Sequence, residues 1–301
     1  MWVKGNTHTH TLNSDGDSPP ETVVKWYRDH GYNFVFITDH EYLTPVDALN
    51  ASFGKAGEFL VLTAQEITDS VNKKPYHANG LGLDRVVMPR KGANVIDSLQ
   101  TDIVNIRNAG GLAQVNHPNF GWALAAAELK ALRDYSLLEI YSGHPLVNYF
   151  GGGGSPSAEQ IWDEVLSSGK VVYGVASDDS HHFKPTSIAS PALPGFGWIV
   201  VRARELSAEA VIEAIGRGDF YSSTGVELEE VSNDAKSISV KIKEKRWSKY
   251  TVQFIGMKGR VLAESVSNPA RYKFRGGEGY VRTKILESNG KMAWTQPVFV
   301  K

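Results

Sequence analysis

Nine histidine, aspartate and glutamate residues recur along the first 181 positions of the chain, each at the edge of an apolar run. They are His8, His10, Asp15, His40, Glu66, His77, His117, Asp179 and His181. This set takes in six of the nine histidines in the sequence, whereas histidines without a common role would fall in helices and loops as often as at strand ends. Imidazole and carboxylate are the ligands that suit zinc, manganese and iron. The pattern therefore predicts a metal site.

The spacing within the set supports the same interpretation. His8 and His10 are two residues apart, so on an extended segment both imidazoles point to the same side. Asp15, in the turn Ser14-Asp15-Gly16, adds a carboxylate nearby, and Asp179 and His181 repeat the two-residue spacing. Two such pairs at opposite ends of a closing sheet can meet across the mouth of a barrel.

Composition limits the classes of protein that the chain can belong to. Its 301 residues are 42% hydrophobic and 22% charged, which is typical of a globular protein of about two domains. The net charge of -1 argues against a nucleic-acid or membrane binder and favours a small-molecule substrate. Without cysteine there are no thiolate ligands. Residues 1–6 lack the pattern of a signal peptide, and no apolar stretch approaches membrane-spanning length, so we expect a cytoplasmic protein.

Apolar runs alternate with amphipathic segments over the first two thirds of the chain, as in parallel strands joined by helices. In the first helical segment, Ser18 can act as the N-cap and Gly31 can end the helix. The candidate strands are residues 2–7, 34–37, 59–63, 112–115, 137–141, 171–176 and 198–201. Most of them end at a candidate ligand, and barrel enzymes place their chemistry at carboxyl-terminal strand ends. We therefore expect a closed or nearly closed α/β barrel.

The pattern changes after residue 224 to short alternating strands separated by turns such as Asn289-Gly290. Strands are expected over residues 236–243, 250–257, 271–274, 280–286 and 295–300. We expect two domains, a barrel over residues 1–226 and a small all-β, sandwich-like domain over residues 227–301.

Seven segments of the barrel region resemble the PHP (polymerase and histidinol phosphatase) metal-dependent hydrolases. The segments are Asn6-Thr7-His8-Thr9-His10, Ser14-Asp15-Gly16, Ile37-Thr38-Asp39-His40, Gln65-Glu66, His77-Ala78-Asn79, Asn116-His117-Pro118 and Ser177-Asp178-Asp179-Ser180-His181. They follow the family's order and cover about residues 1–226. The opening resembles most the stand-alone bacterial branch that includes carbamate-cleaving metallohydrolases. The resemblance implies a distorted (β/α)7 barrel with two or three metal ions at its mouth.

The resemblance also implies which residues hold each ion. The first ion would be held by His8, His10, Glu66 and Asp179. The second would be held by Glu66, His77 and His117, with Glu66 bridging the two ions. The third would take Asp15, His40 and His181. Many relatives have a cysteine in place of His117, so the absence of cysteine from this chain is compatible with the family.

Such a cluster would make a hydroxide available at neutral pH, because two cations about 4 Å apart lower the pKa of a shared water towards about 7. This metal-bridging hydroxide would attack the substrate, and the ions would neutralise charge on a phosphoester. Asp179, His181 and His40 are the catalytic candidates. His181 or His40 can assist protonation only if metal binding leaves a ring nitrogen free.

Other polar residues near the motifs have two possible roles. Asp39 and Asp178 adjoin ligands and can either orient imidazoles or bond to a loop backbone. Glu139 ends an apolar run, where an unpaired carboxylate is costly, so we expect it to support the site or pair with a cation. His182 and Lys184 are candidates for substrate binding, although loop residues of these types are often incidental, and His144 is open to the same two interpretations.

The leading functional prediction is a metal-dependent phosphoesterase that hydrolyses a small phosphomonoester or phosphodiester. The alternative is a metallohydrolase of carbamate, carboxyl ester or amide bonds, since a hydroxide attacks a carbonyl by the same logic. A third possibility is a catalytically silent binding or scaffold barrel, against which the complete ligand set argues.

Overall fold

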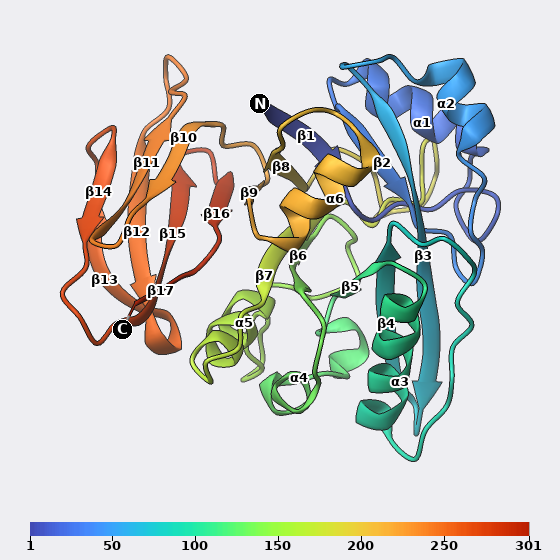
Figure 1. Cartoon of the computed structure of the whole chain (residues 1–301), viewed down its shortest axis with the longest axis horizontal. Coiled ribbons are helices and arrows are strands. Elements are labelled where there is room, and N and C mark those ends of the chain that lie inside the picture. The colour runs from blue at the N-terminus through green and yellow to red at the C-terminus, as the bar shows by residue number, and fades with distance from the viewer. Residues whose placement is uncertain (301) are drawn as a thin grey trace.

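The computed structural model describes residues 1–300 and shows a mixed α/β molecule in which strands outnumber helices (Figure 1). The strands of the first part are β1 (Trp2–Asn6), β2 (Phe34–Ile37), β3 (Leu60–Val71), β4 (Lys74–Leu81), β5 (Leu112–Val115), β6 (Leu137–Ser142), β7 (Tyr173–Ser177), β8 (Trp198–Arg202) and β9 (Phe220–Ser223). The helices are α1 (Pro20–Asp29), α2 (Asp47–Phe53), α3 (Val95–Asn108), α4 (Ala126–Ala131), α5 (Ala158–Leu166) and α6 (Ala208–Gly216). None of the helices in this described part is long and apolar enough to cross a bilayer.

All seven strands predicted for the first part are present, but the structure adds β4 and β9. β3 runs on to Val71 and turns through Asn72 and Lys73, both with positive φ, directly into the antiparallel β4. The expected alternation of parallel strands and helices is therefore broken at this hairpin. β4 has the sequence KPYHANGL, whose polar residues hide the alternation that marks a strand.

The predicted Ser18 cap was wrong. Pro19 is the N-cap residue of α1 and makes no side-chain cap, because the Ser18 hydroxyl donates to Asp17 instead. Pro20 opens the helix with the φ that the first turn needs, and Gly31 follows it with a φ of +74°. Val23 and Tyr27 on the buried face of α1 pack with residues of β2 such as Val35.

The strands of the first part curl around a mouth formed by the carboxyl ends of the parallel strands. β1, β2 and β3 are parallel neighbours, β5, β6 and β7 are another parallel set, and β4 joins them. The segments that follow β1 and β7 pair with each other. The His10 N–H donates to the Ser180 carbonyl and the Asp179 N–H donates to the His8 carbonyl, both at 2.9 Å. The pair His8 and His10 therefore meets the pair Asp179 and His181 across the mouth.

The remaining strands are β10 (Leu228–Asn233), β11 (Ser237–Ile242), β12 (Tyr250–Gly256), β13 (Arg260–Ser265), β14 (Ala270–Lys273), β15 (Gly279–Glu287), β16 (Met292–Thr295) and β17 (Val298–Val300). β10 and β13 were not predicted, and the expected strand over 295–300 is divided between β16 and β17. β10, β11 and β14 form a small second sheet, while the rest extend the main sheet through the pairing of β16 with β9. Val240, Phe254 and Val281 lie in the core between them. The domain boundary near residue 226 stays a prediction.

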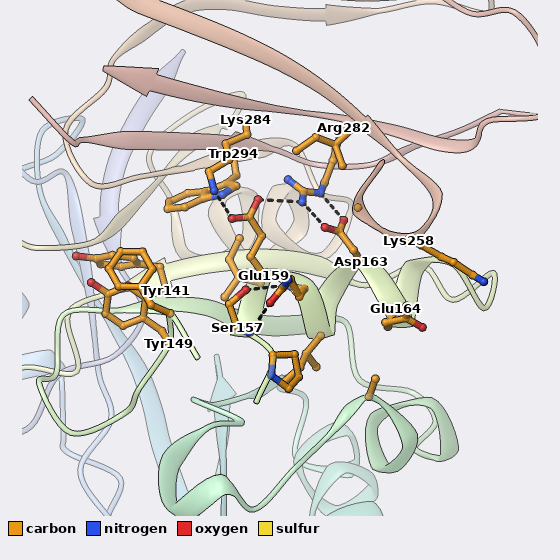
Figure 2. Close-up of a pocket in the computed structure, with 18 of the residues that line it drawn as sticks. Tyr141, Tyr149, Ser157, Glu159, Asp163, Glu164, Lys258, Arg282, Lys284 and Trp294 are labelled. Atoms are coloured by element: carbon orange, nitrogen blue, oxygen red, sulfur yellow. Dashed lines mark hydrogen bonds and ion pairs between the residues drawn. The ribbon is translucent and has the colours of Figure 1, made fainter. Parts of the chain in front are cut away.

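A buried ion network joins β15 to α5 (Figure 2). Arg282 donates from Nε and Nη2 to the two carboxylate oxygens of Asp163, at 2.8 and 2.6 Å, and from Nη2 to Glu159 at 2.9 Å. Its guanidinium also lies 4.8 Å from the ring centroid of Trp162. Lys284 pairs with Glu159 as well. This network holds the C-terminal strands against the outside of the barrel.

Candidate metal centre

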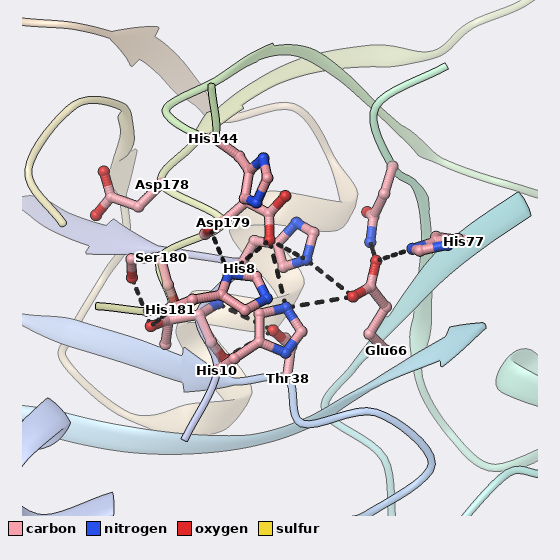
Figure 3. Close-up of polar contacts among 12 residues, drawn as sticks. His8, His10, Thr38, Glu66, His77, His144, Asp178, Asp179, Ser180 and His181 are labelled. Atoms are coloured by element: carbon pink, nitrogen blue, oxygen red, sulfur yellow. Dashed lines mark hydrogen bonds and ion pairs between the residues drawn. The ribbon is translucent and has the colours of Figure 1, made fainter. Parts of the chain in front are cut away.

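The structure brings all nine candidate ligands together at the mouth. Figure 3 labels His8, His10, Glu66, His77, Asp179 and His181 among them. His8, His10, Asp15, His40, His117, Asp179 and His181 lie in loops that follow strands, whereas Glu66 and His77 lie within strands. Glu66 lies on β3 and His77 on β4, whereas His40 follows β2 and His117 follows β5. Backbone bonds lock these segments to one another, because the Glu66 N–H donates to the Asp39 carbonyl at 3.2 Å and the Thr38 N–H donates to the Thr9 carbonyl at 3.0 Å.

The first group consists of His8, His10, Glu66 and Asp179. The Nε2 atom of His8 lies 3.2 Å from Glu66 Oε2 and 3.3 Å from Asp179 Oδ1, and the corresponding distances from His10 Nε2 are 3.3 and 3.4 Å. A tetrahedral ion with ligands at about 2.0–2.1 Å has donor atoms about 3.3–3.4 Å apart. The four nitrogen–oxygen distances therefore match the donor spacing of a tetrahedral coordination shell.

The hydrogen bonds of these imidazoles fit a metal as well. The Nε2 atoms of His8 and His10 are buried and have no hydrogen-bond partner in the described residues. His8 Nδ1 lies 2.9 Å from Glu139 Oε1, and because a carboxylate can only accept, Nδ1 carries the proton. In the singly protonated ring the Nε2 lone pair of His8 is then free and points at the carboxylates. A buried lone pair among acceptors lacks a partner unless a cation lies between them.

Glu66 also faces the second group. Its Oε1 atom lies 3.1 Å from His77 Nδ1 and 3.4 Å from His117 Nε2, while its Oε2 atom faces His8 and His10. Asn116, which lies in one of the motifs but was not predicted to act, donates to Glu66 Oε1 at 2.7 Å. This is the geometry that a bridging carboxylate requires.

Asp15, His40, His181 and His10 form the third group. Asp15 Oδ1 lies 3.3 Å from His181 Nε2, and Oδ2 lies 3.6 Å from His40 Nε2. His10 Nδ1 is 3.6 Å from Asp15 Oδ1, so His10 stands between the first and third groups. This group is the most open of the three, since the Asp15 side chain is 57% exposed.

The charges of the cluster are strongly coupled. Burial on its own would raise the pKa of Glu66 and Asp179, but the imidazoles around them, His8 foremost, hold both pKa values well below the usual range. Burial would likewise lower the pKa of His8, yet Asp179, Glu66 and Glu139 raise it well above 6.5. The carboxylates therefore stay ionised, and the cavity demands positive charge that divalent ions would supply.

Glu139 on β6 lies beside the first group, as the sequence predicted for a supporting residue. Its Oε1 atom accepts from His8 Nδ1 and from the Ser177 hydroxyl, and Oε2 accepts the His117 N–H at 2.9 Å. Glu139 therefore touches two candidate ligands at once and fixes the tautomer of His8.

Asp39 and Asp178 have loop partners and no hydrogen bond to a candidate ligand's ring within residues 1–300. Asp39 accepts from Thr11 and Ser14 and so braces the turn that carries Asp15. Asp178 accepts the Phe196 and Gly197 N–H groups and the Tyr27 hydroxyl. Asp39 and Asp178 could either orient imidazoles or bond to loops, and in the structure both bond to loops.

The mouth opens into a pocket of about 220 Å³. Neither His182 nor Lys184 lines it: His182 Nδ1 accepts the Ala192 N–H, and Lys184 bonds to Asp17. The residues that line this pocket and are not candidate ligands are Phe120, His144, Leu146 and Val147. His144, which the sequence left open between substrate contact and an incidental loop position, follows β6 as directly as His8 follows β1.

A larger pocket of about 610 Å³ lies between α5 and the C-terminal strands. It is the pocket of Figure 2, and its charged residues include the ion network of Arg282. The candidate ligands are not among its lining residues.

No protein-family model and no curated protein sequence matches the chain. Among solved structures, it is similar over 99% of its length to a two-domain protein from Bacteroides vulgatus that contains a predicted PHP-like metal-dependent phosphoesterase, with a TM-score of 0.54, 14% identity and 95% of that chain covered. Two other structures are more distant. One is a provisional metal-dependent phosphoesterase from Bifidobacterium adolescentis, with a TM-score of 0.44 and 15% identity over 63% of this chain and 92% of that chain. The other is a lesion-specific endonuclease from Pyrococcus furiosus, with a TM-score of 0.43 and 12% identity over 73% of this chain and 56% of that chain. The first comparison shows that the chain has the fold of a PHP-like protein, as the sequence resemblance predicted.

Proposed function

We propose that the chain is a metal-dependent phosphoesterase that hydrolyses a small phosphomonoester or phosphodiester at the mouth of the barrel. The observation that carries the proposal is the first group, in which two imidazole Nε2 atoms without hydrogen-bond partners each lie 3.2–3.4 Å from the oxygens of two ionised carboxylates. This donor set of nitrogen and oxygen suits two or three zinc, manganese or iron ions.

The proposed ligands are those predicted from the sequence, with His10 shared between the first and third groups. Ions bound there would supply a hydroxide at neutral pH and neutralise charge on the substrate. The protein keeps the ligands in place: Glu139 holds the His8 proton on Nδ1, and His181 Nδ1 donates to the Asp179 carbonyl at 3.0 Å. Nε2 of His181 and of His40 faces Asp15, so in this proposal both residues serve as ligands and not as proton donors.

The walls of the pocket favour an ester of low charge. Phe120, Leu146 and Val147 are apolar, and no lysine or arginine lines the pocket within the described chain. A phosphomonoester dianion is usually bound by such cations in addition to metals. Among phosphoesters, a phosphodiester monoanion therefore fits best.

The same walls support one second candidate, hydrolysis of a carbamate, carboxyl ester or amide. These substrates are neutral at the reacting group and would not need a cationic side chain. The proposed ligands are the same, so the two candidates differ only in the substrate.

A panel of chromogenic substrates tests the proposal. The metal-loaded protein is assayed with nitrophenyl phosphate, a nitrophenyl phosphodiester, a nitrophenyl acetate and a nitrophenyl carbamate. We expect turnover of the phosphodiester that stops when a chelator removes the metal. Turnover of the carboxyl ester or carbamate alone would reject the phosphoesterase in favour of the second candidate.

A further inference from the structure

His144 lines the pocket and belongs to none of the groups of candidate ligands. It follows β6 in the loop that also carries Leu146 and Val147. Its ring centroid lies 5.3 Å from that of His181, at an angle of 74°. Figure 3 shows it beside Asp179, on the same side of the cluster.

The hydrogen bond to its own loop determines where the proton of His144 is. The Leu146 backbone N–H donates to His144 Nδ1 at 3.2 Å. A backbone N–H can only donate, so Nδ1 must be the unprotonated nitrogen of the ring. The neutral ring therefore carries its proton on Nε2, for which no protein partner exists in the described residues.

Two of the proposed ligands, His8 and His181, have the opposite arrangement. Nδ1 of His8 donates to Glu139 and Nδ1 of His181 donates to the Asp179 carbonyl, which leaves the Nε2 lone pairs free to hold a cation. His144 instead presents an N–H, which repels a cation and attracts an oxygen. The fold thus provides two kinds of imidazole at one mouth.

We propose that His144 is a substrate-binding residue whose Nε2–H donates a hydrogen bond to an oxygen of the bound ester. The inference rests on the proposed function and specifies its substrate contact. No lysine or arginine lines the pocket in the described chain, so this N–H is a donor that the protein itself can supply to an oxyanion. Val147, on the same loop, is a buried part of the pocket wall.

Binding of inorganic phosphate tests this role without relying on turnover. Metal-loaded wild type, His144→Ala, His144→Gln and His30→Ala are compared by titration calorimetry, with metal content and folding measured in parallel. His144→Gln is the conservative variant, since the glutamine amide reaches about as far as Nε2 and also donates. His30 is the control histidine, because it is exposed and stacks on Trp26 at the end of α1.

We expect His144→Ala to bind phosphate about 10- to 100-fold more weakly, as for the loss of a hydrogen bond to a charged group, with unchanged metal content. His144→Gln should stay within about three-fold of wild type, and His30→Ala should match it. If wild type turns over a phosphodiester, kcat/KM should fall in the same order.

Binding by His144→Ala within two-fold of wild type would overturn the inference. So would equal losses in His144→Ala and His144→Gln, loss of metal from His144→Ala, or failure of wild type to bind phosphate. If phosphate binding follows the expected order but no phosphoester is cleaved, the proposed function fails while the inference stands.

Discussion

Replacement of Glu139 by glutamine should weaken metal binding although the residue is not a proposed ligand. Its two oxygens accept three hydrogen bonds, from His8 Nδ1 and Ser177 Oγ on one side and from the His117 N–H on the other. Glutamine offers one acceptor and one donor. In one orientation its NH2 group faces the His117 N–H, and two donors oppose each other.

In the other orientation the NH2 group faces His8 Nδ1. His8 can then accept only by moving its proton to Nε2, and this tautomer cannot bind a cation at Nε2. Loss of such a partner of a ligand typically costs 10- to 100-fold in metal affinity, or about 1.4–2.8 kcal/mol. We therefore expect Glu139→Gln to bind zinc or manganese about 10- to 100-fold more weakly in calorimetric titrations.

Glu159→Gln is the matched control. Glu159 is another largely buried carboxylate, but it pairs with Arg282 and Lys284 on the outside of the barrel. This variant should lose thermal stability and keep the wild-type metal affinity. Metal affinity within two-fold of wild type in Glu139→Gln, or the same loss in both variants, would refute the reasoning.

Two further predictions concern stability. Asp102 is buried with one oxygen bonded to the Arg90 N–H and the other without a partner, and burial raises the pKa of this carboxyl to about 7. Because the pKa is higher in the folded than in the unfolded chain, stability should fall as the pH rises from about 4 to about 7. In urea unfolding, the free energy of unfolding of Asp102→Asn should therefore fall by about 1–2 kcal/mol less between pH 5 and pH 8 than that of the wild type. An equal fall in the two proteins would contradict this prediction. A Cβ at Gly5 on β1 would collide with the Phe34 ring, so Gly5→Ala should lower the free energy of unfolding by about 1–3 kcal/mol, and an unchanged urea midpoint would show that the core has room.

The strands and the candidate ligands were predictable because one pattern encodes both. An apolar run predicts the strand, and the polar residue that ends the run lies at the mouth, as His40 and His117 do. The two-residue spacings at 8–10 and 179–181 also indicated that both side chains of each pair point to the same side of the chain. Assignment of these residues as ligands stays a prediction until a metal is observed.

Other features depend on contacts between distant parts of the chain. β4 was missed because its polar residues face partners that the fold supplies, as when Asn79 donates to the Thr7 carbonyl. The pairing of Arg282 with Asp163 joins residues 119 positions apart, and nothing local marks either as buried. The tautomer of His144 is set by the Leu146 N–H, which only the loop conformation reveals.

The metal cluster is tested most directly by anomalous diffraction from crystals of protein purified without chelator. We expect two or three transition-metal peaks, one of them about 2.0–2.2 Å from His8 Nε2, His10 Nε2, Glu66 and Asp179. Absence of any peak among these residues after soaking in zinc, manganese or iron would contradict the proposed metal centre and the hydrolase with it.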